Sequence, residues 1–248
     1  MASFHHGAVE IAYLDQGEGE PIVLVHGFAS NKEVNWVQPT WTTALKDRRV
    51  IALDNRGHGR SSKLYDPADY HLRLMTEDVR ALLDHLGVER ADVMGYSMGA
   101  RITAFLAHDH PERVRSAILG GLGDALITGG GLRENIAEAL EAPSLDDVTD
   151  PVQRTFRQFA EHTRSDLRAL AACIRGSRQR MTEEEARAIR VPVLIAVGTK
   201  DNVAGSPHEL ARHIPGARVL EIPNRDHMLA VGDRIYKQGV VEFLQEQR

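Results

Sequence analysis

Residues Gly95-Tyr96-Ser97-Met98-Gly99 indicate the fold of this chain most clearly. It fits the pattern G-x-S-x-G. It stands between an apolar run at 91–94, typical of a short buried strand, and residues 100–107, typical of a helix. A serine on such a sharp turn is forced toward a positive φ and needs small neighbours, which the two glycines provide. The turn lifts the hydroxyl clear of the sheet at a helix N-terminus, so Ser97 is a candidate nucleophile.

The composition excludes several classes of protein. A net charge of −5 over 248 residues argues against a nucleic-acid partner, because such partners require a basic surface. The lone Cys173 excludes an internal disulfide framework and a multi-cysteine metal site, and it suits a reducing compartment. No apolar run approaches the ~20 residues that span a bilayer, and the first residues do not resemble a leader. We therefore expect a soluble, cytoplasmic protein that binds no membrane and no metal.

Strands and helices alternate along most of the chain. Unbroken apolar runs at 21–25 and 49–53 are typical of strands buried on both faces, and glycines around 8–14 favour a hairpin. Further segments have the periodicity of a helix or of a buried strand: helices at 76–86, 207–213 and 234–245, and strands at 114–119, 193–197 and 218–222. This alternation predicts an α/β fold with a mostly parallel sheet and helices on both faces.

The segment 125–190 differs from the rest because it shows helical periodicity and no strand signal. We expect a core made of residues 1–124 and 191–248 and a helical insert made of residues 125–190. The triple glycine at 129–131 precedes a helix and could hold an anion, but a hinge at the start of the insert is the better interpretation.

Ser97 needs a base and a group that orients the base. In proteins with this serine turn, the chain order is serine, acid, histidine. Asp201 follows the strand at 193–197 and His227 follows the strand at 218–222, so both should lie at the same sheet edge as Ser97. Asp124, which follows the strand at 114–119, is an alternative acid. Asp226 is poorly placed because it is adjacent to His227.

The oxyanion that forms during acyl transfer needs backbone N–H donors. One donor should be Met98, the residue after the nucleophile. The other should be Phe28, in the loop that follows the strand at 21–25, where Gly27 allows the backbone to approach closely. We interpret His26 as a brace of this loop, since Ser97 already has a candidate base.

The chain resembles the α/β-hydrolase superfamily over nearly its whole length. The serine turn, His26-Gly27-Phe28 and the glycine-rich stretch at 54–61 match the family's nucleophile turn, oxyanion loop and architectural turn. The resemblance implies an eight-stranded, mostly parallel sheet and identifies residues 125–190 as a small helical cap. Haloalkane dehalogenases and epoxide hydrolases of this superfamily attack with an aspartate, whereas a serine favours acyl transfer.

We therefore predict a cofactor-free serine hydrolase that cleaves carboxylic esters through an acyl-enzyme intermediate. The glycines at 121 and 123 do not begin a dinucleotide-binding fingerprint, because Leu126 stands where the pattern G-x-G-x-x-G needs its last glycine. The same side chains would also serve a lactonase, a thioesterase, a carbon–carbon bond hydrolase or a perhydrolase. A ligand receptor on this fold is a further alternative, and it would show turnover below roughly 0.01 s⁻¹ against a typical ~10 s⁻¹.

The expected partner is a small-molecule ester, and the oligomeric state is not predicted. Because the cap is short, we expect an accessible cleft that tolerates bulky or extended esters. The residues expected to line the cleft come from the serine turn, the oxyanion loop and the start of the cap: Phe28, Tyr96, Met98, Leu126, Ile127 and Leu132.

Overall fold

A computed structural model of the protein describes residues 2–130 and 135–247. The described residues form one eight-stranded sheet in the order β1-β2-β4-β3-β5-β6-β7-β8. The pairs β1–β2 and β2–β4 are antiparallel, and all the others are parallel. The strands are β1 (Ala2–His6), β2 (Val9–Gln16), β3 (Pro21–Val25), β4 (Arg49–Leu53), β5 (Ala91–Tyr96), β6 (Val114–Gly120), β7 (Val193–Gly198) and β8 (Arg218–Ile222).

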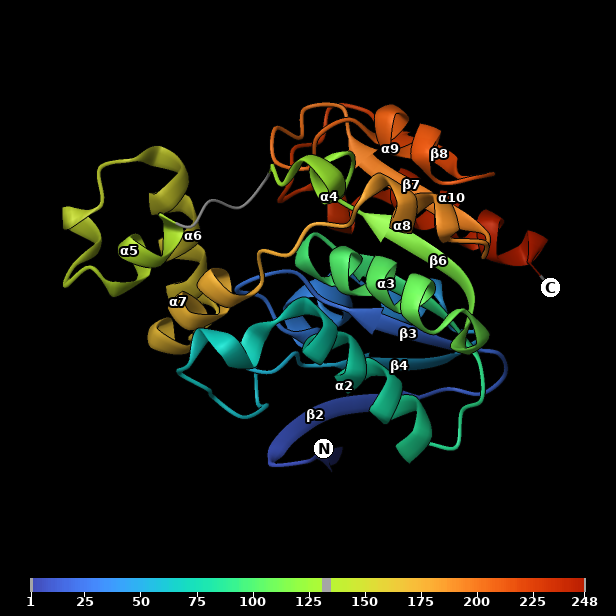
Figure 1. Ribbon diagram of the computed structural model, residues 1–248, viewed down its shortest axis with the longest axis horizontal. Helices are drawn as coiled ribbons and strands as arrows, with labels where there is room; N and C mark the ends of the chain where they lie inside the picture. The colour runs from blue at the N-terminus through green and yellow to red at the C-terminus, as the bar shows by residue number, and fades with distance from the viewer. Residues whose placement is uncertain (1, 131–134, 248) are drawn as a thin grey trace.

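Helices cover both faces of this sheet (Figure 1). One face packs against α2, α3, α8 and α9, and the other packs against α1 and α10. The helices are α1 (Trp41–Ala44), α2 (Leu72–His85), α3 (Met98–Asp109), α4 (Ala125–Thr128), α5 (Ile136–Glu141), α6 (Pro151–His162), α7 (Leu167–Gly176), α8 (Glu183–Ala188), α9 (Pro207–His213) and α10 (Arg234–Glu246). Short helical turns are η1 (Glu33–Val37), η2 (Pro67–Tyr70), η3 (Pro111–Arg113), η4 (Leu145–Asp147) and η5 (Ala230–Gly232).

The fold class predicted from the sequence is confirmed. The predicted bounds of β3, β4, β8 and α9 coincide with the observed ones, because continuous apolar runs and a Ser-Pro start mark them clearly. Helix α2 begins four residues before the predicted start at residue 76. Its first-turn cap is the side chain of His71, which accepts from the N–H of Arg73 at 3.3 Å. Histidine is not among the usual capping residues, so the sequence did not mark this start.

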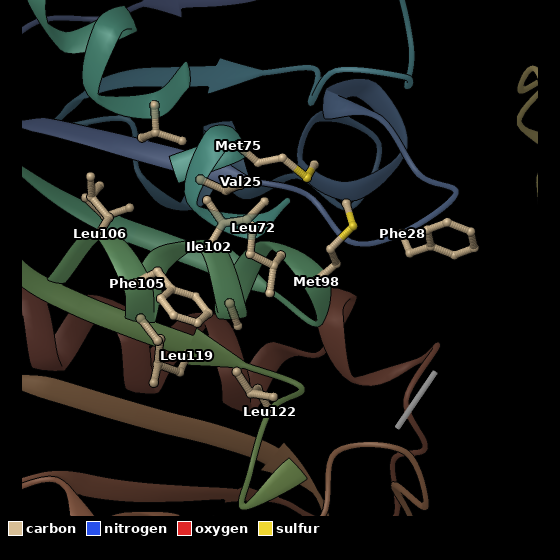
Figure 2. Close-up of a cluster of buried hydrophobic side chains, with 14 of the residues drawn as sticks. Val25, Phe28, Leu72, Met75, Met98, Ile102, Phe105, Leu106, Leu119 and Leu122 are labelled. Atoms are coloured by element: carbon tan, nitrogen blue, oxygen red, sulfur yellow. The ribbon is translucent and has the colours of Figure 1, made fainter. Parts of the chain in front are cut away.

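The core that supports the serine turn lies between α2, α3 and the central strands. Figure 2 shows Leu72 and Met75 of α2 packed toward Ile102 and Phe105 of α3, with Met98 farther along the same cluster. All five of these side chains are at most 3% exposed. Such burial fixes α3, and with it the turn that precedes it, because an interior packed at crystal-like density does not allow a helix to shift freely.

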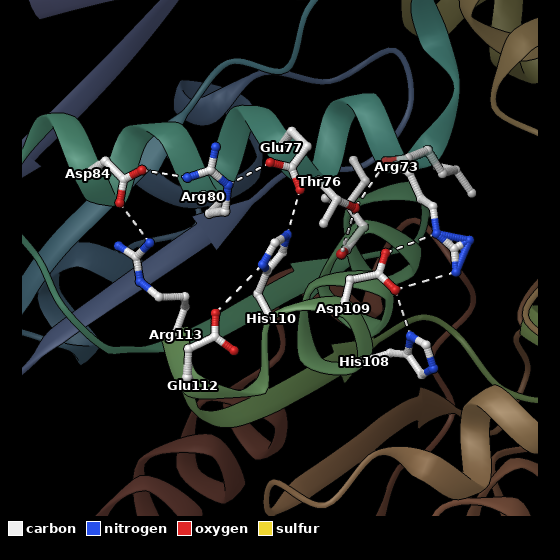
Figure 3. Close-up of polar contacts among 12 residues, drawn as sticks. Arg73, Thr76, Glu77, Arg80, Asp84, His108, Asp109, His110, Glu112 and Arg113 are labelled. Carbon is white, nitrogen blue, oxygen red and sulfur yellow. Dashed lines mark hydrogen bonds and ion pairs between the residues drawn. The ribbon is translucent and has the colours of Figure 1, made fainter.

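The outer surfaces of α2 and α3 carry a network of ion pairs (Figure 3). Arg80 pairs with Glu77 and Asp84, and Glu77 also contacts His110 from the end of α3. These groups are part-exposed, so water screens each pair and its contribution to stability is small. The network therefore adds only a little to the packing of α2 against α3, which depends mainly on the apolar core between the two helices.

The segment between β6 and β7 is helical, and its helices occupy two places. Helices α5, α6 and α7 lie together to one side of the sheet, whereas α4 and α8 lie against the sheet layers (Figure 1). Helix α7 packs closely on η2, since a Cβ at Gly176 would lie 1.9 Å from the carbonyl oxygen of Pro67. Helices α5, α6 and α7 therefore lie beside the sheet at the carboxyl ends of its parallel strands.

Candidate active site

Ser97 occupies a strained turn between β5 and α3. Its backbone has φ 54° and ψ −112°, a conformation that costs a non-glycine residue about 1–3 kcal/mol. The flanking glycines make the turn possible. A Cβ at Gly95 would lie 2.1 Å from the carbonyl oxygen of Gly99, and one at Gly99 would lie 2.0 Å from that of Val25. The structure therefore explains both glycines of the G-x-S-x-G pattern by contact with backbone.

The structure brings the predicted nucleophile, base and acid together. The Nε2 atom of His227 lies 2.9 Å from the Oγ of Ser97. The Nδ1 atom of His227 lies 2.7 Å from Oδ2 of Asp201. Asp201 follows β7 and His227 follows β8, so three loops at the carboxyl edge of the sheet supply the three side chains. This is the arrangement in which an imidazole can accept the proton of a serine hydroxyl.

The carboxylate of Asp201 is held in its charged form. Its side chain is fully buried, and burial alone opposes ionisation. The hydrogen bond from His227 and those from the N–H groups of Val203 and Ala204, at 2.8 and 2.9 Å, outweigh that effect and lower the pKa of Asp201. Since a carboxylate only accepts hydrogen bonds, Nδ1 of His227 carries the proton and Nε2 is left to accept one.

The other candidate acids have different partners. Oδ1 of Asp124 accepts from the N–H of Ser206 at 2.6 Å, which ties the end of β6 to the start of α9. Oδ1 of Asp226 accepts from the N–H groups of Met228 and Leu229, and this closes the turn around His227. The structure therefore pairs His227 with Asp201 and gives both alternatives the role of loop braces.

Tyr96 fixes the position of His227 from the other side. Its hydroxyl donates to the backbone carbonyl of His227 at 2.6 Å, and the two rings lie 5.6 Å apart. Burial raises the pKa of Tyr96 well above its ordinary value, so this hydroxyl stays protonated and remains a donor. The sequence did not suggest this contact, because it joins side chain and backbone across 131 positions.

The oxyanion loop lies directly against the serine turn. A Cβ at Gly27 would lie 3.5 Å from the Cβ of Ser97. Within the described part of the chain, the N–H groups of Phe28 and Met98 have no hydrogen-bond acceptor. Two backbone donors beside a nucleophile, both without a protein partner, are what a developing oxyanion requires.

Buried polar side chains hold the oxyanion loop in place. Nε2 of His26 accepts from the N–H of Asn55 at 3.0 Å, and its Nδ1 lies 2.7 Å from the carbonyl oxygen of Gly27. Burial lowers the pKa of His26, so the ring is neutral and can accept. Oδ1 of Asn35 accepts from the N–H of Gly27 at 3.1 Å. No pattern in the sequence indicated a role for Asn35, which lies eight positions after Gly27.

Two hollows meet at Ser97. The larger has a volume of about 270 Å³ and is mostly apolar. Its lining comes from the oxyanion loop, η1, α6 and the loop that carries His227: Gly27, Phe28, Ser30, Val34, Asn35, Pro39, Tyr96, Ser97, Phe156, Phe159, His227, Met228, Leu229, Val231 and Gly232. The smaller has a volume of about 40 Å³ and is lined by Ser97, Met98, Arg101, Gly121, Leu122, Gly129, Gly130, Ile174, Ser177, Arg178, Val203 and Ala204.

The residues predicted to line the cleft divide three ways. Phe28 and Tyr96 line the larger hollow, and Met98 lines the smaller one. Leu126 and Ile127 line neither: Leu126 is fully buried in the core and Ile127 packs against that core. Helix α4 has only four residues and is tied to the loop after β7, because the N–H of Ala125 donates to the carbonyl oxygen of Ala204. In this position the side chain of Leu126 lies inside the core. Leu132 lies outside the described residues.

Side chains of α6 and α7 take the place that the sequence assigned to the start of the cap. Phe156 and Phe159 of α6 line the larger hollow, and Ile174 of α7 lines the smaller one. The sequence predicted helices in this segment, but helical periodicity does not distinguish burial in a core from burial around a ligand. Among the described residues, no cluster of three or more His, Cys, Asp or Glu side chains has the arrangement of a metal site. In the same part of the chain, no helix is long and apolar enough to cross a bilayer.

Comparison with known proteins identifies the family. A family model described as alpha/beta hydrolase fold matches residues 20–158. The chain therefore belongs to the α/β-hydrolase family, as the eight-stranded sheet and the serine turn indicate.

The individual proteins that the chain resembles are named for different activities. The chain is 36% identical over 229 residues to the dihydrolipoyllysine-residue acetyltransferase component of the acetoin cleaving system of Pseudomonas putida; the match covers 85% of this chain and 59% of that protein. It is 27% identical to a putative 2-succinyl-6-hydroxy-2,4-cyclohexadiene-1-carboxylate synthase of Bacillus subtilis, over 95% of both chains. The crystal structure of the enol-lactonase from Burkholderia xenovorans superposes with a TM-score of 0.83 at 24% identity, over 98% of this chain and 100% of that one.

Proposed function

We propose that this protein is a serine hydrolase of carboxylic esters that needs no cofactor. The single observation that carries the proposal is the hydrogen-bonded series Ser97–His227–Asp201, with separations of 2.9 and 2.7 Å, of which Ser97 and His227 line an apolar hollow. Membership of the α/β-hydrolase family supports it. The proposed partner is a small-molecule ester. The proposed domain organisation is a core with a cap formed by residues 125–190.

The proposed reaction uses the groups of this site in turn. Nε2 of His227 takes the proton of Ser97 while Oγ attacks the ester carbonyl carbon. The N–H groups of Phe28 and Met98 hold the oxyanion of the tetrahedral intermediate. The carbon–oxygen bond to the alcohol then breaks, and the proton on Nε2 passes to the departing oxygen. Water, deprotonated by the same histidine, cleaves the acyl-enzyme and releases the acid.

Chemical labelling combined with kinetics tests the proposal. A fluorophosphonate probe should label the wild-type protein and should not label Ser97→Ala, because only an activated serine reacts. The same substitution should lower kcat/KM for a short aryl ester by at least about 1000-fold. Ser3→Ala is the matched control, since Ser3 lies on the edge strand β1 and bonds Glu10 at the surface. Unchanged turnover in Ser97→Ala would refute the proposal.

The alternatives that share this chemistry need a substrate panel. Lactones, thioesters, diketone-like compounds and peroxide with a carboxylic acid would each use Ser97 and His227, so the mechanism alone does not rank them. Values of kcat/KM on one representative of each class, measured beside a simple ester, decide among them. Labelling of Ser97 with no measurable turnover on any of them would favour a ligand receptor.

A further inference from the structure

The smaller hollow beside Ser97 has an unusual charge. Among the described residues that line it, two are arginines, Arg101 and Arg178, and none is acidic. Arg180 lies close by, because its Nε would be 2.1 Å from a Cβ placed on Gly129, another residue of the lining. A cavity of about 40 Å³ has room for only a few atoms. The hollow is therefore small, positively charged and adjacent to the nucleophile.

Arg101 is the residue of this hollow whose charge needs explaining. It lies on α3 four residues after Ser97, which is the N-cap of this helix. Arg101 is therefore about one helical turn from Ser97 and on the same side of the helix. Its Nη2 donates to the carbonyl oxygens of Ala125 and Gly130 at 2.8 and 2.9 Å, which holds the guanidinium in place. Burial, together with the nearby charges of Arg178 and Arg180, lowers its pKa to about 10.

Three buried arginines elsewhere in the described chain each form an ion pair with a carboxylate. Arg48 pairs with Asp92 at 2.5 Å, Arg56 with Asp78 at 2.7 Å, and Arg157 with Glu161 at 2.7 Å. Within residues 2–130 and 135–247, Arg101 forms no ion pair with a carboxylate. A largely buried cation without a counter-ion is unfavourable. An anion bound in the hollow would supply the missing partner, as a carboxylate does for the other three.

The positions of the two hollows decide which part of a substrate enters each. His227 lines the larger, apolar hollow and must protonate the departing alcohol, so the alcohol occupies that side. The acyl part then extends from the carbonyl carbon into the smaller hollow, past Met98. Resting on the proposed ester hydrolysis, we propose that the substrates are half-esters of short dicarboxylic acids with apolar alcohols, whose free carboxylate binds Arg101.

Two matched esters test the charge preference. Monobenzyl succinate carries the carboxylate in its acyl part, and benzyl 4-methylpentanoate has an isopropyl group in its place. The benzyl alcohol leaving group is common to both and suits the apolar hollow. We expect kcat/KM to be about 10- to 100-fold higher for the half-ester, the range that a charge-assisted hydrogen bond supplies. In 4-(acetoxymethyl)benzoate the carboxylate is in the leaving alcohol, and this ester should gain nothing from Arg101.

Variants of Arg101 link the preference to this residue. Arg101→Met should lower the ratio of the two kcat/KM values about 10- to 100-fold, and Arg101→Lys should retain part of it because it keeps the charge. Arg212→Met is the control, since Arg212 is 73% exposed on α9 and pairs with Glu209. A ratio near one in the wild-type protein, or a ratio that Arg101→Met leaves unchanged, overturns the inference while ester hydrolysis itself stands.

A binding measurement separates this inference from the proposed hydrolysis. Monobenzyl succinate is titrated calorimetrically into Ser97→Ala and into Ser97→Ala/Arg101→Met, neither of which can form the acyl-enzyme. A dissociation constant about 10-fold or more higher in the double variant supports the anion site even if no ester is hydrolysed by the wild-type protein. Equal affinities show that Arg101 does not bind the carboxylate, whatever the reaction is.

Discussion

Replacing Asp201 by Asn tests how the structure sets the protonation of His227. Oδ1 of Asp201 accepts from the N–H groups of Val203 and Ala204, and Oδ2 accepts from Nδ1 of His227. An asparagine must keep its carbonyl oxygen toward the two N–H groups, because its NH₂ group cannot accept from them. The NH₂ group then faces Nδ1 of His227.

The consequence is a change of tautomer. Nδ1 must accept from the amide, so the proton moves to Nε2, which faces Ser97 and can no longer take the hydroxyl proton. We expect kcat/KM for a short ester to fall about 10³- to 10⁴-fold, equivalent to ~4–5.5 kcal/mol of transition-state stabilisation. Stability should change little, because the two backbone hydrogen bonds are kept. The assay is initial-rate kinetics on purified protein, with thermal unfolding as the check on folding.

The matched control is Asp124→Asn. Oδ1 of Asp124 accepts from the N–H of Ser206, and an amide oxygen serves equally well. Activity should therefore stay within about 3-fold of wild type. If Asp201→Asn keeps more than a tenth of the activity while Asp124→Asn loses most of it, the orientation of His227 does not depend on Asp201 and the reasoning is wrong.

Three other features give measurable outcomes. Gly99→Ala places a Cβ 2.0 Å from a backbone oxygen of β3, so we expect a loss of roughly 3 kcal/mol or more in unfolding free energy, and a melting temperature near wild type would contradict this. Burial raises the pKa of Cys173 to about 12, so iodoacetamide at pH 8 should modify it only after unfolding, as mass spectrometry would show. Burial opposes ionisation of Asp54, but hydrogen bonds from Lys32 and from the backbone N–H of Arg60 lower its pKa below the ordinary value. Its contribution is therefore present above the unfolded pKa of about 3.9 and is lost as pH falls through the folded pKa, which urea unfolding between pH 2.5 and 6 should show as a decrease; stability that rises in acid would contradict this.

The chemical part of the site could be predicted because it follows the order of the strands. Each of Ser97, Asp201 and His227 comes just after a strand of the parallel sheet, and parallel strands bring their carboxyl ends to one edge. Short, continuous apolar runs mark those strands, so the sequence alone predicts that residues more than a hundred positions apart lie together. The glycines at 95 and 99 indicated the turn, because a side chain at either position would clash with the backbone.

The residues that line the two hollows could not be predicted in the same way. Leu126 and Phe156 both have the spacing of a buried helical position, yet the first belongs to the core and the second lines the larger hollow. The difference arises from how α4 and α6 pack on other segments, which a local pattern does not contain. A signal for Arg101 was present: an arginine stands in an otherwise apolar stretch of α3, four residues from the nucleophile.

The two parts of the site also differ in how they are held, and this bears on how specificity can change. The serine turn and the oxyanion loop are fixed by backbone contacts within the sheet edge, where an added methyl group would already clash. Part of the walls of the two hollows comes from Phe156 and Phe159 of α6 and from Ile174 of α7, and both of these helices pack on α5. Substitutions on these helices can reshape the walls without moving Ser97 or His227, because the backbone that positions those residues lies in other elements. Substrate preference should therefore respond to changes in α6 and α7 that leave reactivity toward a fluorophosphonate unaltered.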